Sequence, residues 1–195
     1  DPEMSRGLGD VYKRQGYNHT FGKNRSGNPD FLAENADKFG YKYICVPPQM
    51  FNDQIISSTL IRKLLKEGNI LLANRLLGTN FMLEGTVIRG AQLGRTIGFP
   101  TANIKYTPEI VQIPFGVYSA RVNNRPAVLN WGMKPTVHNT KEPIVEVHII
   151  NFDGDLYGKN IEIEITSKIR DEKKFRGLEE LRTQIEKDVK ECLKL

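Results

Sequence analysis

Residues 116–131 read GVYSARVNNRPAVLNW, two runs of β-forming residues on either side of Asn123 and Asn124. Asparagine tolerates the backbone of a tight turn, so the segment predicts a β-hairpin. Alternating apolar and polar residues predict strands over residues 81–88, 116–122, 125–131, 143–152 and 160–169. Several short antiparallel strands in about a hundred residues are typical of a small closed β-barrel. The sequence therefore predicts a mainly β fold in this part of the chain.

A helix is expected after the last of these strands. Acidic residues fall in its first turn and basic residues in its last, as the helix dipole favours. Its apolar residues recur at helical spacing, at Leu178, Leu181, Ile185, Val189 and Cys192. We expect this amphipathic helix to cover one side of the barrel.

Before residue 80 the pattern is different. A helix is predicted over residues 30–39 and a strand over residues 41–46. Ser57 or Ser58 can cap a helix that runs to about Glu67, and Asn69 can cap another that ends at Gly78.

These patterns predict a division of the chain near residues 78–80. Residues 16–78 would form an α/β remnant of a larger module, and residues 79–195 the barrel domain with its helix. Residues 1–15 have no apolar period and match neither part, so they are expected to be foreign or disordered.

The composition excludes several classes of protein. The chain has 195 residues, and its sequence contains no apolar run of the ~20 residues that a membrane helix needs and no apolar signal segment, so a cytoplasmic location without membrane contact is expected. Cys45 and Cys192 are far apart and support neither a disulfide framework nor a zinc site. The net charge of +5 fits the binding of anionic nucleotides, and equally weak binding to nucleic acid.

Residues 85–103 combine glycines, arginines and a Pro-Thr-Ala-Asn sequence. Gly90 and Gly94 allow a backbone to approach a polyphosphate, and Arg95 offers a planar fork for phosphate oxygens. Thr101 and Asn103 supply neutral oxygens that suit Mg²⁺. The alternative is that the glycines only mark bulges and turns of a sheet.

Glu146 lies between Val145 and Val147 in a segment of strong β propensity. If the valines face the core, Glu146 and His148 share the opposite face. From the pattern alone, Glu146 could be a solvated strand residue. Asn130 could similarly be a turn former, as could Thr136, and Trp131 could fill the core or line a pocket.

Together with later blocks in the same order, the glycine-rich run resembles the riboflavin kinase family. Those blocks are residues 114–118, 130–136, 145–148, 155–158 and 169–175. The resemblance covers residues 81–190 and implies a kinase that uses Mg²⁺ and ATP to convert riboflavin into FMN. It implies Glu146 as the catalytic base, Thr101 and Asn103 as residues that help hold the metal, and a flavin-closing segment with Arg170, Lys173 and Phe175. For ATP it implies Gly90, Gly94, Arg95, Thr101, Asn103 and Asn130.

Residues 16–27 and 56–62 are similar to the end of the FMN adenylyltransferase module that bacteria fuse to this kinase. Ser57, Ser58, Thr59 and Arg62 match its second nucleotide motif, where hydroxyls and an arginine meet a triphosphate. The earlier HxGH-type motif of that module has no match in this sequence. We therefore expect a chain truncated at its N-terminus that has lost adenylylation.

Two other functions are compatible with the sequence. One is a flavin- or nucleotide-binding fragment without turnover. The other is a basic barrel that binds single-stranded nucleic acid, although no aromatic ladder accompanies the basic residues. The expected partners are therefore small-molecule substrates and not nucleic acid.

Overall fold

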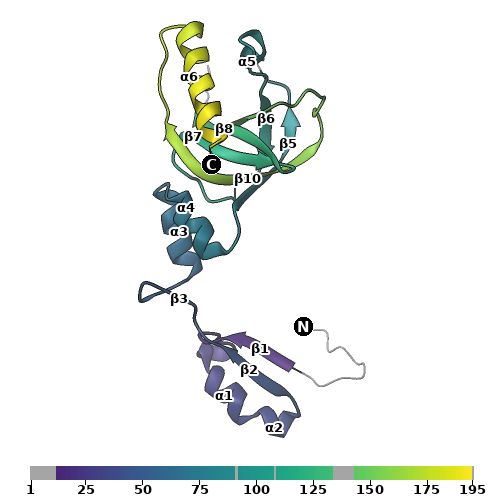
Figure 1. Cartoon of the computed structure of the whole chain (residues 1–195). Coiled ribbons are helices and arrows are strands. Elements are labelled where there is room, and N and C mark those ends of the chain that lie inside the picture. Colours follow the sequence, from purple (N-terminus) through teal and green to yellow (C-terminus); the bar gives the residue numbers. More distant parts are fainter. Residues whose placement is uncertain (1–11, 91, 108, 134–142, 195) are drawn as a thin grey trace. The chain divides into compact units, whose positions relative to one another are not determined.

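The computed structural model describes residues 12–90, 92–107, 109–133 and 143–194 (Figure 1). The chain divides into two compact units, one ending at Ile56 and the other beginning at Ser57. Each unit is described by itself below. Among the described residues, no helix is long and apolar enough to cross a membrane.

The second unit contains a closed barrel of antiparallel strands. Around the barrel the strands follow the order β10-β5-β6-β9-β8-β7, and each pairs with its neighbours. Their bounds are Phe81–Ile88 (β5), Ala102–Tyr106 (β6), Gly116–Val122 (β7), Arg125–Met133 (β8), Pro143–Ile149 (β9) and Asn160–Asp171 (β10). The predicted mainly β fold with a small closed barrel is confirmed.

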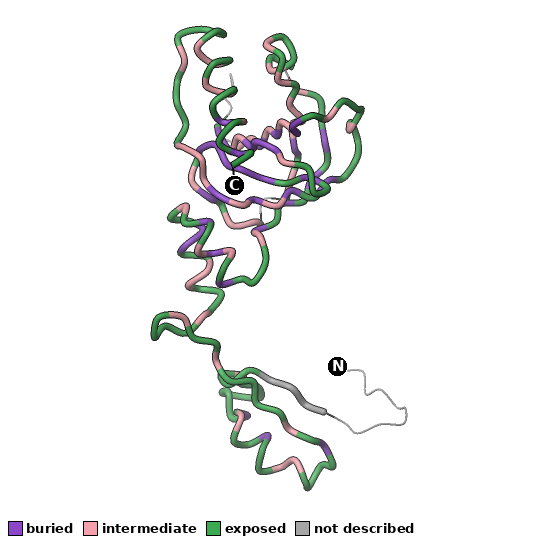
Figure 2. Tube along the Cα trace, in the orientation of Figure 1, coloured by how far each residue is buried: buried purple, intermediate pink, exposed green. Residues whose placement is uncertain are grey.

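The barrel encloses the core. Buried and exposed residues alternate along β5, and Figure 2 shows the buried positions recurring along the barrel strands. Trp131 is fully buried, with its ring centroid 5.3 Å from that of Tyr106, so it fills the core. The long strand β10 pairs with β5 through residues 160–165 and with β7 through residues 163–171, and the pairing with β7 contains two register shifts.

The hairpin between β7 and β8 forms as predicted. Asn123 and Asn124 have φ angles of 50° and 62°, the positive values that a tight two-residue turn requires. Val122 faces Arg125 directly across the turn.

Several details of the barrel differ from the sequence prediction, beginning with β8 and β10, which each extend two residues further than expected. Strand β6 was not predicted. The strand expected over residues 143–152 ends earlier, at Ile149, and Asn151 then takes a positive φ of 54°. The backbone N–H of Ile150 still donates to the carbonyl of Pro126 on β8, and the chain turns away after it.

Helix α6, Leu178–Cys192, covers the outer face of β7 and β8, as the sequence predicts. Cys192 packs with Val117, Val128 and Ile150, and Val189 lies against this cluster. A short helix α5, Leu93–Thr96, lies in the glycine-rich segment. Figure 1 shows α5 and α6 on the same side of the barrel.

Helices α3, Ser58–Lys66, and α4, Ile70–Leu77, precede the barrel and begin and end close to the predicted positions. The side chains of Ser57 and Asn69 cap them, and Gly78 ends α4 with a φ of 75°. Asn74 ties α4 to the barrel, because its amide donates to the carbonyl of Ile165 at 2.9 Å and accepts from the N–H of Phe81 at 2.8 Å. The compact unit therefore includes both helices, and the boundary expected at residues 78–80 stays a prediction.

The first unit has a two-stranded parallel sheet of β1, Tyr12–Gly16, and β2, Lys42–Val46, and a short hairpin of β3, Met50–Phe51, and β4, Gln54–Ile55. The helix predicted over residues 30–39 is wrong as one continuous element. After the short 3₁₀ turn η1, Lys23–Arg25, it forms as α1, Pro29–Glu34, and α2, Ala36–Phe39, separated at Asn35. The Asn35 side chain donates to the carbonyl of Phe31, which favours the break.

Part of the segment expected to be foreign or disordered, residues 12–15, lies in β1, whereas residues 1–11 lie outside the described residues. The described residues of this unit bury few side chains. The origin of residues 1–15 stays a prediction.

Candidate active site

Two pockets open on the second unit, and Thr101 lines both. The large pocket, about 770 Å³, is bounded by Arg89, Arg95, Thr101, Asp155 and Tyr157 among others. The small pocket, about 210 Å³, is bounded by a set that includes Gly94, Thr101, Asn130, Glu146, His148, Arg170, Lys173, Phe175 and Asp188. The outer face of β7, β8 and β9 and residues of α5 and α6 line the small pocket.

Glu146 lies on the outer face of the barrel. Its neighbours Val145 and Val147 are each 1% exposed and face the core, so the predicted alternation is confirmed. In the strand register Glu146 stands between Asn103 on β6 and Asn130 on β8. Directly opposed residues of antiparallel strands project from the same face. One carboxylate and two amides thus form a polar row across three strands.

The glycine-rich segment is packed closely against this row. A Cβ at Gly90 would overlap the amide of Asn103, and a Cβ at Gly94 would overlap the carbonyl of Phe99. The N–H of Phe99 donates to the carbonyl of Gly94 at 2.8 Å, which closes the turn that leads into Thr101. Close packing alone therefore explains a glycine at positions 90 and 94. The same packing places Thr101 and Asn103 beside the polar row.

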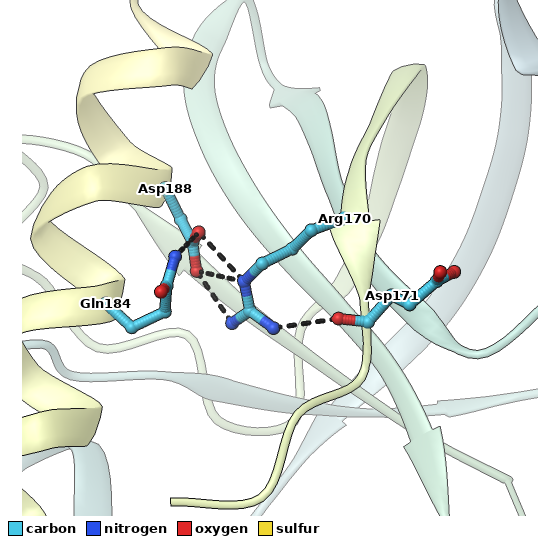
Figure 3. Close-up of polar contacts among 4 residues, drawn as sticks. All are labelled: Arg170, Asp171, Gln184 and Asp188. Carbon is cyan, nitrogen blue, oxygen red and sulfur yellow. Dashed lines mark hydrogen bonds and ion pairs between the residues drawn. The ribbon is translucent and has the colours of Figure 1, made fainter.

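The end of β10 and the segment that follows it lie along the small pocket. Arg170, Lys173 and Phe175 all line this pocket, beside residues of α6. Figure 3 shows that Arg170 forms hydrogen bonds with Asp188 of α6 and with the carbonyl of Asp171. Lys168 donates a hydrogen bond to the Asp171 carboxylate, and this bond lowers the pKa of that carboxyl.

The family model described as riboflavin kinase matches residues 77–195, more than half of the chain. The chain belongs to the riboflavin kinase family. The matched region contains the whole barrel, α6, both pockets and the polar row around Glu146. The resemblance inferred from the sequence is therefore confirmed.

Similar proteins are bifunctional enzymes by name. A riboflavin kinase/FMN adenylyltransferase of Buchnera aphidicola is 41% identical over 180 residues, which cover 89% of this chain and 57% of the relative. That of Bacillus subtilis is 38% identical over 196 residues, covering 96% of this chain and 61% of the relative. The chain thus spans about three fifths of the length of these relatives.

A solved structure also resembles the chain. It is that of a protein named as a macrolide-efflux protein, from Streptococcus pneumoniae, with a TM-score of 0.78 and 31% identity. The match covers 90% of this chain and 57% of the other.

Sequence reasoning missed several residues of these pockets. His148 lines the small pocket, its Nδ1 lies 2.8 Å from the carbonyl of Pro100, and its ring contacts that of Phe99 edge-on. The alternation that identified Glu146 placed His148 on the same face of the strand, and this was the available signal. Arg89 and Tyr157 line the large pocket, with the Arg89 guanidinium 5.4 Å from the centre of the Tyr157 ring.

The residues predicted from the adenylyltransferase motif line neither of the two pockets. Ser57 caps α3 by accepting from the N–H of Leu60 at 3.2 Å, and Ser58, Thr59 and Arg62 are exposed on the same helix. A helix cap requires no ligand, so their nucleotide role stays a prediction. Thr136 lies outside the described residues.

The described residues hold no group of three or more His, Cys, Asp and Glu side chains that could bind a metal. The predicted metal residues are of another kind, a hydroxyl at Thr101 and an amide at Asn103. Mg²⁺ commonly takes only one or two protein oxygens, with water and substrate phosphates completing its shell. The donor set therefore fits a nucleotide-bound Mg²⁺.

Proposed function

We propose that this chain transfers the terminal phosphoryl group of ATP to the 5′-hydroxyl of riboflavin and so makes FMN. The observation that carries the proposal is the junction of the two pockets at Thr101. Arg95, suited to phosphate oxygens, lines the large pocket, and Glu146, suited to a hydroxyl proton, lines the small one. Phosphoryl transfer requires that donor and acceptor meet in line, and two adjoining pockets provide such a meeting point.

ATP would occupy the large pocket, with its terminal phosphates directed toward Thr101. Arg95 would bind phosphate oxygens through its planar fork. Thr101 and Asn103 would help hold Mg²⁺, which, when bound, supplies positive charge to the terminal phosphates. Gly90 lets the amide of Asn103 lie close to the preceding loop. Catalysis by these residues would consist mostly of positioning and electrostatic stabilisation.

Riboflavin would occupy the small pocket. Phe175, Leu181 and Ile185 give this pocket an apolar surface that suits a flavin ring. Glu146 would accept the proton of the 5′-hydroxyl while the hydroxyl oxygen bonds to the γ-phosphorus and the bond from phosphorus to ADP breaks. A general base of this kind contributes roughly 10² to 10⁴ in rate.

The loss of FMN adenylylation stays a prediction from the sequence, since relatives of this chain carry that activity in their names. A cytoplasmic location and the absence of nucleic-acid and membrane partners likewise stay predictions from sequence.

The test is to incubate the purified chain with riboflavin, ATP and Mg²⁺ and to separate the flavins by chromatography. We expect FMN and no FAD. FAD would refute the expected loss of adenylylation. If a folded protein binds riboflavin but forms neither product, the chain is a binding fragment and the kinase proposal is wrong.

A further inference from the structure

Arg170, at the end of β10, is held by helix α6 (Figure 3). Its Nε donates to both carboxylate oxygens of Asp188, at 2.9 and 3.1 Å, and its Nη2 donates to one of them at 2.8 Å. Its Nη1 donates to the carbonyl of Asp171 at 2.9 Å. Three of the five N–H groups of the guanidinium are therefore used within the protein.

Asp188 is built to receive this arginine. Its side chain is only 3% exposed, and the Gln184 amide donates to its Oδ1 at 2.9 Å. A buried carboxylate is costly unless it is paired and hydrogen-bonded, and here both conditions are met. Because the two charges compensate, the pair presents little net positive charge to the small pocket.

The pair also supports an aromatic ring. The guanidinium carbon of Arg170 lies 5.7 Å from the centre of the Phe175 ring, and the Lys173 ammonium lies 5.8 Å from the same centre. Both distances fall within the range of cation–π attraction. Phe175 lines the small pocket. A ring fixed in this way offers a flat apolar wall.

Lys173 differs from Arg170 in its surroundings. Its side chain is 56% exposed, and its ammonium lies 3.8 Å from a Glu180 carboxylate oxygen, a loose and solvated pair. Lys173 can therefore reorient toward a new anion at the pocket, whereas Arg170 would first have to break several hydrogen bonds.

Resting on the proposed function, we propose that Arg170 and Asp188 form a lock that positions Phe175 against the flavin, and that Arg170 is not a phosphate ligand. Asp188 is then a positioning residue that acts through Arg170. The cation available to the 5′-phosphate of FMN is Lys173. Helix α6 thus contributes to the flavin site in two ways, with the apolar side chains of Leu181 and Ile185 and with the buried carboxylate of Asp188.

The experiment measures the binding of riboflavin and of FMN by quenching of flavin fluorescence, and the KM for Mg·ATP in the FMN assay. The variants are Asp188→Asn, Arg170→Lys and Lys173→Gln. Glu186→Gln is the matched control, because Glu186 lies on the same helix and pairs with Arg182 on the exposed surface. A cooperative melt establishes that each variant is folded.

A lock predicts that Asp188→Asn and Arg170→Lys weaken riboflavin and FMN by the same factor, about tenfold or more, which corresponds to about 1.4 kcal/mol. The KM for Mg·ATP should stay within about twofold of the value for the parent. Lys173→Gln should weaken FMN more than riboflavin, and Glu186→Gln should change neither.

The proposal is overturned if Arg170→Lys weakens FMN clearly more than riboflavin, because Arg170 would then contact the phosphate. It is also overturned if the folded variants bind both flavins like the parent, or if the parent binds no flavin. Should Asp188→Asn fail to fold, Arg170→Lys decides, since it keeps the opposite charge beside Asp188. Flavin binding that responds to these variants without any FMN formation would refute the kinase proposal and leave the lock standing.

Discussion

At the scale of single residues, the hydroxyl of Thr101 and the side-chain amide of Asn103 supply the neutral oxygens that are proposed to help hold Mg²⁺. We predict that Thr101→Ala and Asn103→Ala raise the KM for Mg·ATP far more than the KM for riboflavin, because Mg²⁺ tolerates little distortion of its octahedral shell. Excess Mg²⁺ should restore part of the activity. Steady-state kinetics at several Mg²⁺ concentrations provide the measurement.

Thr96→Ala is the matched control for Thr101→Ala. Thr96 belongs to the same segment, but it is exposed and its hydroxyl donates to the carbonyl of Leu93. Removing this hydroxyl should leave the KM values for Mg·ATP and for riboflavin unchanged. Equal weakening of both substrates by the Thr101 and Asn103 variants, with no dependence on Mg²⁺, would mean that the segment is only a structural turn.

The sequence predicted some of these residues and could not predict others. Glu146 was found by alternation, because valines on either side must share the opposite face of a strand. Its position between Asn103 and Asn130 depends on the register of strands far apart in the chain, which no local pattern encodes. Asp188 stands on the apolar face of α6 beside Ile185 and Val189. A carboxylate on that face indicates a buried ion pair, so the sequence contained a signal for Asp188 that was missed.

At the scale of elements, strand β7 contains a tyrosine that makes the barrel sensitive to alkaline pH. Tyr118 is fully buried and its hydroxyl donates to the carbonyl of Pro114. Burial raises the pKa of Tyr118 well above its usual range. The unfolded chain loses this proton near pH 10 while the folded chain retains it, so the free energy of unfolding falls as the pH rises above 10.

We therefore predict that the melting temperature of the parent falls more steeply between about pH 9 and pH 11 than that of Tyr118→Phe. The variant will melt lower at neutral pH, because it lacks the hydrogen bond to Pro114, so the comparison concerns the two slopes. Burial also raises the pKa of Tyr106, and a residual slope should remain. Parallel slopes for the two proteins would contradict the assignment.

Elements with a strong local signal were predictable. The Asn-Asn turn, the caps of α3 and α4 and the face of α6 all follow from a few neighbouring residues. Strand β6 was missed because it has only five residues, of which Ile104 alone is buried, so its alternation is too short to recognise. Pairing with β5 and β9 stabilises it, and this pairing is a property of the closed barrel.

At the scale of the whole molecule, the catalytic unit should work without the residues that precede it. We predict that a chain of residues 57–195 melts cooperatively and makes FMN at the rate of the parent. Residues 79–195 should still make FMN but melt at a lower temperature, because the Asn74 bonds to the barrel are lost. Each lost hydrogen bond contributes about 1 kcal/mol to the free energy of unfolding.

Asn74→Ala in the full chain serves as the control for this deletion. This variant should show part of the decrease in melting temperature and leave the rate of FMN formation unchanged. A folded but inactive chain of residues 79–195 would mean that the upstream helices complete the kinase site. The boundary expected at residues 78–80 would then be functionally wrong.

Glu146→Gln is the variant that bears on the central claim, the transfer of phosphate to a hydroxyl that Glu146 deprotonates. The amide preserves the shape of the side chain but cannot take the proton. Glu162→Gln is the control, since Glu162 is an exposed strand residue of β10 and lines neither pocket. Riboflavin and ATP should bind to both variants nearly as they bind to the parent.

The most direct measurement is a single turnover with ATP labelled in its terminal phosphate and with both substrates at saturating concentration. The parent and Glu162→Gln should pass the label to FMN at the same rate. Glu146→Gln should do so roughly 10² times more slowly or worse, the effect of losing a general base. A Glu146→Gln rate within a few-fold of the parent, or no labelled FMN from the folded parent, would contradict the account.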